Sequence, residues 1–455
     1  MTVYASVVPF HQHELEKSFW LWLSTSSGDI TSLKYNGVEY QDSSKYTHIG
    51  SGLGSATVSS KISGNYATIT IATSTLTQYY VAVSGQSAIY IGTYTTAEPS
   101  VGELRFIARL AKSKVPNGIP QAEINGGTAI EGSDVYNVNG QTRSKFYSSV
   151  PFINDKVHGV TGSGVGIYMV MPGNAYETSG GGPFFRDINN QGSAQQELYW
   201  YMNSGHMITE SFRTGFFGPY AMVFTSGSAP SSSLDTSFFS SLGLKGYVAA
   251  SGRGTVKGTI SGVASGFTIV VGLKNSAAQY WGTASGTSYT ISGVKPGTYT
   301  ATLYKKELEV GTGSVTVSAG GTATLNLSSN ESVKSVIWQI GVPDGTPSGF
   351  LNSDKIEKMH PSDSRMGSWG PVTYTIGSSS PSSFPMAQFK SVNSPTTIRW
   401  TASSSQIGAR TLRIRTTSSF AGGRPVITVN SWTSAIPAAP TQIDSRGVTR
   451  GTWRG

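Results

Sequence analysis

The sequence predicts an all-β protein made of three successive domains. Short segments in which apolar and polar residues alternate recur along most of the 455 residues, and turns rich in Gly, Ser and Asn separate them. Charged residues make up only 13 % of the chain, and Ser, Thr, Gly and Tyr stand where a helical bundle would need Ala, Glu, Lys and Leu. Aromatic residues reach 11 %, which argues against intrinsic disorder and for a packed core.

The first 23 residues differ from those that follow. They lack a basic segment leading into an apolar run, so no signal peptide is recognisable, and the Trp-rich residues 19–23 are compatible with a helix. From residue 24 to about residue 245, short segments with alternating apolar and polar residues follow one another. The alternation is clearest in residues 66–72, 89–94, 104–110, 166–171, 197–202 and 220–224. We therefore assign residues 1–247 to a large antiparallel β-sandwich whose N-terminal segment is atypical.

The second predicted domain covers residues 248–332. It contains short strands at regular spacing, and the turn Lys295-Pro296-Gly297 leads directly into one of them. This rhythm predicts a sandwich similar to an immunoglobulin or fibronectin type III domain.

The third predicted domain covers residues 333–455 and is expected to be a jelly roll. Its strands are expected at residues 372–376, 396–401, 411–416 and 426–430, with a short helix at 354–359 that ends before Pro361. The chain stops in a Gly/Arg-rich stretch without a closing strand, so we expect this domain to be C-terminally truncated.

Several classes of function are disfavoured by composition. The net charge is +9, but the 33 basic residues form no runs, so no nucleic-acid partner is predicted. No apolar run of ~18 residues is present, so no membrane span is expected. The absence of cysteine excludes disulfides, thiolate catalysis and Cys-ligated metals. The six histidines lack metal-site spacing and no glycine-rich loop suits a phosphate, so neither metal nor cofactor is predicted.

The densest cluster of unusual residues begins at Glu197. On a strand, Glu197, Tyr199 and Tyr201 would share one face, while the apolar residues between them would face the core. Phenols stack on sugar rings and hydrogen-bond to hydroxyls, so such a row suits a carbohydrate cleft. His206 follows a short turn and could reach the same face. The alternative is an ordinary tyrosine ladder beside a surface histidine.

A second cluster contains two arginines. By the same alternation, Arg105 and Arg109 would share a face, where two guanidiniums suit a substrate that bears a carboxylate. The alternative is a solvated strand face. Lys145 belongs to neither cluster, and a single lysine is by residue type expected to be a solvated surface charge.

These clusters lie within longer segments that resemble the rhamnogalacturonan lyases of polysaccharide lyase family 4. The segments are residues 102–110, 126–134, 142–149, 179–189, 198–211, 245–254, 359–366, 419–425 and 444–450. The resemblance implies a galactose-mutarotase-like β-sandwich, a fibronectin type III-like domain and a jelly roll similar to carbohydrate-binding modules. It also implies endo-acting, metal-independent β-elimination at the rhamnose-α-1,4-galacturonate bond of rhamnogalacturonan I, a pectic polysaccharide, which leaves a 4,5-unsaturated galacturonate.

The resemblance also implies roles for individual residues. Lys145 and His206 take the positions of the catalytic pair, although the residue types allow either to act as the base. The residues implied to bind substrate are Arg105, Tyr199, Tyr201 and Arg446, and we add Arg109 because it shares the face of Arg105. No cofactor is implied. The family implies a secreted protein, which we expect to be a monomer, and Gly28 and Ile71 stand where some relatives carry a disulfide.

Two other classes of function remain as alternatives. The same aromatic cleft could belong to a pectin-binding protein without catalytic activity. A glycoside hydrolase using two carboxylates, for instance Glu197 and Glu210, would give hydrated products instead of unsaturated ones.

Overall fold

The computed structural model describes residues 19–100, 102–132, 135–144, 150–174, 182–184, 188–203, 211–332, 335–355, 360–416 and 423–438. Strands dominate these residues, and the helices among them are 3₁₀ turns of three to six residues. The predicted all-β class is therefore confirmed. None of the described helices has the length and apolar character needed to cross a membrane.

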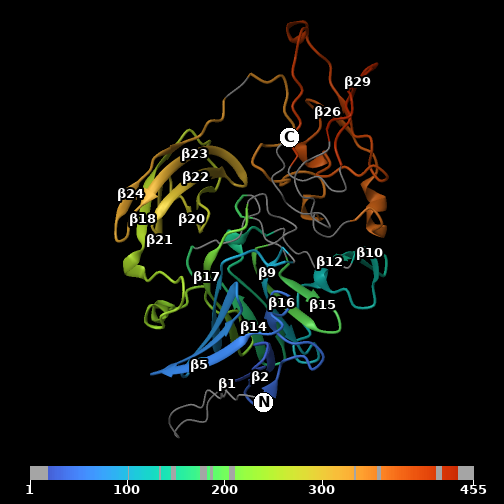
Figure 1. The fold of residues 1–455 in the computed structure, drawn as a ribbon. Coiled ribbons are helices and arrows are strands. Elements are labelled where there is room, and N and C mark those ends of the chain that lie inside the picture. The colour runs from blue at the N-terminus through green and yellow to red at the C-terminus, as the bar shows by residue number, and fades with distance from the viewer. Residues whose placement is uncertain are drawn as a thin grey trace.

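The first sandwich has two main sheets (Figure 1). One has the order β13-β14-β17-β8-β7-β6-β5, and its strands are β5 (Thr57–Ser63), β6 (Tyr66–Ala72), β7 (Leu76–Val83), β8 (Ala88–Thr95), β13 (Val157–Gly162), β14 (Val165–Val170) and β17 (Gly215–Thr225). The other has the order β15-β16-β9-β4, and its strands are β4 (His48–Ile49), β9 (Leu104–Leu110), β15 (Asn190–Gly192) and β16 (Gln196–Asn203).

Aromatic side chains fill the space between these two sheets. Tyr80 on β7 meets Phe106 on β9 with ring centroids 6.2 Å apart, and Tyr220 on β17 meets Trp200 on β16 at 5.8 Å. All four side chains are buried. Because large buried rings contribute most to the free energy of a core, these contacts fix how the site-bearing strands β9 and β16 sit on the larger sheet.

The helix considered for residues 19–23 is wrong. These residues form β1 (Phe19–Leu23), which pairs with β2 (Ile30–Tyr35), and β2 continues into β3 (Val38–Glu39). Phe19, Leu21 and Leu23 are buried, whereas Trp20 and Trp22 lie on the opposite face with their rings stacked at 5.9 Å. Burial of every second side chain is the pattern of a strand, and here it follows from the pairing of β1 with β2.

A separate three-stranded sheet lies beside the sandwich. It consists of β10 (Thr128–Glu131), β11 (Val135–Val138) and β12 (Gln141–Ser144), and β12 packs against the 3₁₀ turn η1 (Pro120–Ala122). The β11–β12 hairpin closes through Asn139 and Gly140, whose φ angles are 52° and 79°. Two consecutive residues with positive φ make the tight turn that matches strand twist, and Asn-Gly is the preferred pair for it. The other 3₁₀ turns in this part of the chain are η2 (Phe152–Asn154), η3 (Ser237–Ser241) and η4 (Ala250–Gly252).

The second sandwich has its own pair of sheets and its own core. One sheet contains β21 (Ser288–Val294), β18 (Gly254–Ser261) and β24 (Thr322–Thr324), with β25 (Leu327–Ser328) also paired to β18. The other has the order β20 (Gln279–Thr283), β19 (Ile269–Lys274), β22 (Gly297–Lys305) and β23 (Leu308–Val317). Buried Val, Leu, Ile and Tyr side chains from both sheets meet between them.

The third part of the chain has little regular structure in its described residues. Its strands are β26 (Thr373–Thr375), β27 (Thr397–Arg399), β28 (Thr428–Val429) and β29 (Trp432–Thr433), and its 3₁₀ turns are η5 (Ser353–Lys355), η6 (Ser364–Trp369), η7 (Pro381–Ser383) and η8 (Ser404–Gln406). β26 and β27 fall within two expected strands and pair in parallel. The strand expected at residues 411–416 is wrong, and Leu412 and Ile414 are 48 % and 47 % exposed there. Of the helix expected at 354–359, η5 covers the start and residues 356–359 lie outside the described residues.

Candidate active site

Four of the predicted site residues lie on one face of the paired strands β9 and β16: Arg105, Arg109, Tyr199 and Tyr201. The antiparallel register sets Arg105 opposite Tyr201 and Arg109 opposite Glu197. The residues between them point into the core of the first sandwich: Leu104, Phe106, Ala108, Leu110, Leu198, Trp200 and Met202. The predicted alternation of both segments is therefore confirmed. Strand pairing joins what the sequence presents as two separate clusters.

At one end of this face, Arg105 contacts Glu103, Tyr201 and, through Nη2, the Ser51 hydroxyl at 3.4 Å. Its Nη1 donates to the Tyr201 hydroxyl at 2.9 Å and forms an ion pair with Glu103. The guanidinium carbon also lies 5.8 Å from the centre of the Tyr201 ring. Glu103 was not among the predicted site residues, although its position two residues before Arg105 places it on the same face by alternation.

At the other end, Glu197 joins Arg109 to Tyr199. Arg109 Nη1 lies 2.5 Å from Glu197 Oε1, and the Tyr199 hydroxyl donates to Glu197 Oε2. Burial and then the charge of Glu197 raise the pKa of Tyr199 well above its usual range, so Tyr199 is a neutral phenol at physiological pH. The rings of Tyr199 and Tyr201 stack with centroids 6.0 Å apart.

We call these six residues the arginine–tyrosine face: Glu103, Arg105, Arg109, Glu197, Tyr199 and Tyr201. Its two guanidiniums are balanced by two carboxylates, which hold them in fixed orientations. Within the described residues, Nε of Arg105 and Nε of Arg109 are buried without a hydrogen-bond partner. The guanidiniums suit recognition of a carboxylate, whereas Tyr199 and Tyr201 are each 4 % exposed and use their hydroxyls within the face. Glu197 is engaged as an orienting carboxylate, whereas a general acid must hold a transferable proton.

Two histidines that the sequence did not single out support this face. The backbone carbonyl of Tyr199 contacts His158 Nε2 at 2.7 Å, and His158 is 9 % exposed. His48 on β4 lies directly opposite Ile107 of β9, and its Nδ1 is 3.6 Å from Asp29. His48 reaches the site through the pairing of β4 with β9, and His158 through a side-chain contact from β13 in the other sheet, so sequence spacing carries no signal for either.

The other predicted site residues, Lys145, His206 and Arg446, lie outside the described residues, as does Glu210 of the hydrolase alternative. In the chain, Lys145 directly follows the last residue of β12, and His206 is three residues beyond the end of β16. Across the described ranges, no group of three or more His, Asp and Glu side chains gathers as a metal site would require.

The Glu197→Gln variant is expected to lose about 3 kcal/mol of unfolding free energy, because it leaves a largely buried guanidinium without its counter-charge. The side chains of Arg109 and Glu197 are 15 % and 8 % exposed. Glu123→Gln is the matched control, because its ion pair with Lys112 is more open, with 39 % of the Glu123 side chain exposed. There we expect a loss below about 1 kcal/mol. Chemical denaturation measures both, and equal losses would contradict the role given to Glu197.

Comparison with known proteins places the chain in a family. The chain matches the family models for rhamnogalacturonan lyase B, N-terminal, at residues 14–246, for polysaccharide lyase family 4, domain II, at 252–325, and for domain III of the same family at 336–455. It is 58 % identical to a probable rhamnogalacturonate lyase A of Aspergillus terreus, over 95 % of this chain and 82 % of the relative. It is 57 % identical to the rhamnogalacturonate lyase A of Emericella nidulans and 56 % identical to that of Aspergillus aculeatus, over 95 % of this chain and 82 % and 83 % of these relatives. The chain therefore belongs to the rhamnogalacturonan lyases of polysaccharide lyase family 4.

Proposed function

We propose that this protein is an endo-acting rhamnogalacturonan lyase that cleaves the rhamnose-α-1,4-galacturonate bond of rhamnogalacturonan I by β-elimination. The observation that carries the proposal is the arginine–tyrosine face. It offers two guanidiniums and two neighbouring phenols on one sheet surface of a chain that belongs to this family. Galacturonate supplies the carboxylate and the hydroxyls that such a surface would bind.

The reaction begins with removal of the C5 proton of galacturonate. This proton is acidic only when the charge of the adjacent carboxylate is compensated, which is the role proposed for Arg105, with Arg109 and Arg446. As the base takes the proton, the C5–H electrons form the C4=C5 double bond and the C4–O4 bond breaks. The guanidiniums stabilise the enolate-like charge that develops on the carboxylate.

Lys145 is the proposed base and His206 the proposed acid that protonates the leaving O4. A free lysine has a pKa near ~10.4, so a base at neutral pH must have a lowered pKa, which nearby guanidiniums favour. Each proton transfer contributes roughly 10²- to 10⁴-fold to the rate. Tyr199 and Tyr201 would bind the sugar rings and their hydroxyls.

The protein as a whole is proposed to be a secreted monomer acting on pectin without a metal, a cofactor, a nucleic acid or a membrane as partner. We propose the domain division 1–247, 248–332 and 333–455, supported by the separate sheets of the two sandwiches and by a second hydrophobic cluster that lies within the second sandwich. The arginines would neutralise the substrate carboxylate, as Ca²⁺ does in other pectic lyases.

The test is to incubate the whole purified chain with rhamnogalacturonan I and a metal chelator. We expect a rise in ultraviolet absorbance from the conjugated uronate, and products that mass spectrometry finds lighter by one water than hydrolysis products. Hydrated products would favour a hydrolase. A folded chain that binds the polysaccharide but forms no unsaturated product would overturn the proposal and favour a non-catalytic binding protein.

A further inference from the structure

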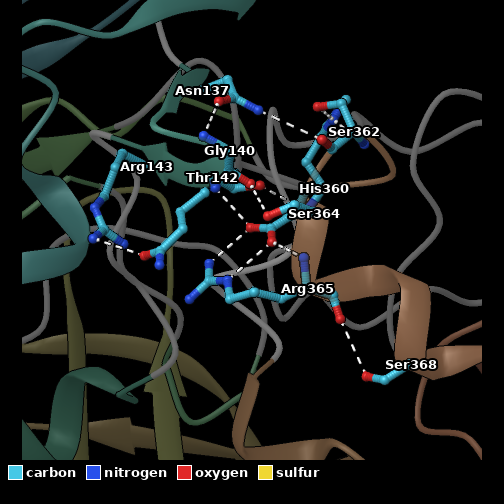
Figure 2. A network of polar contacts seen from close by, with 11 residues as sticks. Asn137, Gly140, Thr142, Arg143, His360, Ser362, Ser364, Arg365 and Ser368 are labelled. Carbon is cyan, nitrogen blue, oxygen red and sulfur yellow. Dashed lines mark hydrogen bonds and ion pairs between the residues drawn. The ribbon is translucent and has the colours of Figure 1, made fainter.

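Residues of the third part of the chain form hydrogen bonds with the turn of the β11–β12 hairpin (Figure 2). The Ser364 backbone N–H and hydroxyl both donate to the Gly140 carbonyl, at 2.8 Å and 2.9 Å. The His360 N–H donates to Thr142 Oγ1 at 3.1 Å. The Thr142 N–H donates to Oδ2 of Asp363 at 2.6 Å, a contact between residues 221 positions apart. We call these contacts of Gly140, Thr142, His360, Asp363 and Ser364 the clasp.

Asp363 is the charged centre of the clasp. Its carboxylate is fully buried, and it accepts from Nε of Arg365 at 2.9 Å and from Nη2 at 2.7 Å. It also caps the 3₁₀ turn η6 by accepting from the Arg365 N–H. Burial alone would raise the pKa of Asp363, but the hydrogen bonds from Arg365 and Thr142 outweigh it and lower the pKa to about 2. The carboxylate is therefore charged at any pH at which the protein would work.

The hairpin needs such an anchor. Its sheet contains only β10, β11 and β12 and is not continuous with either large sheet of the first sandwich. A three-stranded sheet is stable by itself only if it buries a hydrophobic face or packs against another element, as β12 does against η1 and the clasp. Gly140 fits closely, because a Cβ built on it would lie 2.9 Å from Ser364 Oγ. Thr142 is only 3 % exposed beneath these contacts.

We propose that Asp363 is a positioning residue for the elimination reaction, acting through the Thr142 backbone on the strand that leads to Lys145. Thr142 is three residues before Lys145 in the chain, so the clasp would fix the end of β12 from which the proposed base follows. The third domain would then position β12 in addition to supplying Arg446. This inference rests on the proposed function, since it gives Lys145 the role of base.

The test compares Asp363→Asn with Asp344→Asn in the whole chain. Asparagine keeps the shape of Asp363 but loses the charge that both Arg365 and the Thr142 N–H use. Asp344 is the matched control: it is 3 % exposed, lies in the same part of the chain and pairs with Lys306 at 2.7 Å, next to the second sandwich and away from the hairpin. Gly140→Ala disturbs both the clasp and the hairpin turn, because alanine is strained at the positive φ of Gly140, and it leaves the Asp363–Arg365 pair intact.

For Asp363→Asn and Gly140→Ala, we expect kcat to fall between about tenfold and 10²-fold with KM nearly unchanged, the scale of a misplacement of about 1 Å. Asp344→Asn should keep kcat even if it lowers the melting temperature. Hydrogen exchange of the peptide spanning residues 135–144 should accelerate in the two clasp variants and not in Asp344→Asn.

Two outcomes would overturn the inference. One is a clasp variant with faster exchange in the hairpin but wild-type kcat, which would make the clasp purely structural. The other is an equal loss of kcat in Asp344→Asn, which would reflect general destabilisation. If the wild-type chain forms no unsaturated product, the proposed function fails as a whole, and the exchange measurement then reports on the clasp alone.

Discussion

Replacement of Lys145 by alanine is expected to lower kcat on rhamnogalacturonan I by about 10²- to 10⁴-fold, the usual contribution of a positioned general base. The C5 proton of galacturonate must leave in the step that breaks the C4–O4 bond, and alanine has no group to accept it. KM should change little, because the arginine–tyrosine face that would bind the sugar is intact. The initial rate of ultraviolet absorbance increase at saturating substrate measures kcat directly.

A matched variant separates this role from a general effect of charge. Lys61→Ala removes an exposed lysine of β5 in the same sandwich, and its kcat should equal that of the wild type. The wild-type rate should also increase with pH as the base loses its proton, and Lys145→Ala should lack this dependence. A Lys145→Ala variant with wild-type kcat would assign proton abstraction to another residue, and His206→Ala would be the next variant to assay.

The arginine–tyrosine face illustrates what a single sequence can predict. Alternation was enough to put Arg105 with Arg109, and Tyr199 with Tyr201, because neighbours on one strand face follow a period of two. It could not join the two pairs, since β9 and β16 are about ninety residues apart and strand pairing depends on the whole sheet. Glu103 was within reach of the same rule, whereas His48 and His158 were not.

Residues 19–23 and 411–416 show the complementary limit. The sequence Phe-Trp-Leu-Trp-Leu is apolar throughout, so its period is ambiguous until pairing with β2 buries only every second side chain. Residues 411–416 do alternate, yet they form no strand, because an alternating segment needs a partner on which to bury its apolar face. Gly28 and Ile71, matched by resemblance to a disulfide position, are indeed neighbours: a Cβ on Gly28 would lie 2.4 Å from Ile71 Cγ2.

Replacement of Arg105 by lysine is expected to lower kcat by about 10²- to 10³-fold, similar to the loss of one donor that stabilises a developing anion. Lysine keeps the positive charge but not the planar guanidinium, whose Nη1 contacts both Glu103 and the Tyr201 hydroxyl and whose Nη2 donates to Ser51. The charge on the galacturonate carboxylate grows as the C5 proton leaves, so the loss should fall mainly on kcat and less on KM. Arg253→Lys is the control, because this guanidinium binds the carbonyls of Val248 and Gly293, remote from the site, and its kcat should not change.

Methyl-esterified substrate makes this prediction sharper. Esterification makes the C5 proton intrinsically more acidic but removes the charge that Arg105 is proposed to bind, and we expect the lost contact to dominate, so that the wild-type enzyme prefers the free acid. The Arg105→Lys variant should be slower mainly on the free acid and little changed on the ester. The ratio of kcat/KM on the free acid to kcat/KM on the ester should therefore be smaller than in the wild type. An equal loss on both substrates would mean that Arg105 supports the fold of the face through Glu103 and Tyr201, and that the carboxylate is bound elsewhere. A narrowed preference, with Arg253→Lys unchanged, would assign the substrate carboxylate to the Arg105 end of the face, since no other change in the variant distinguishes an acid from its ester.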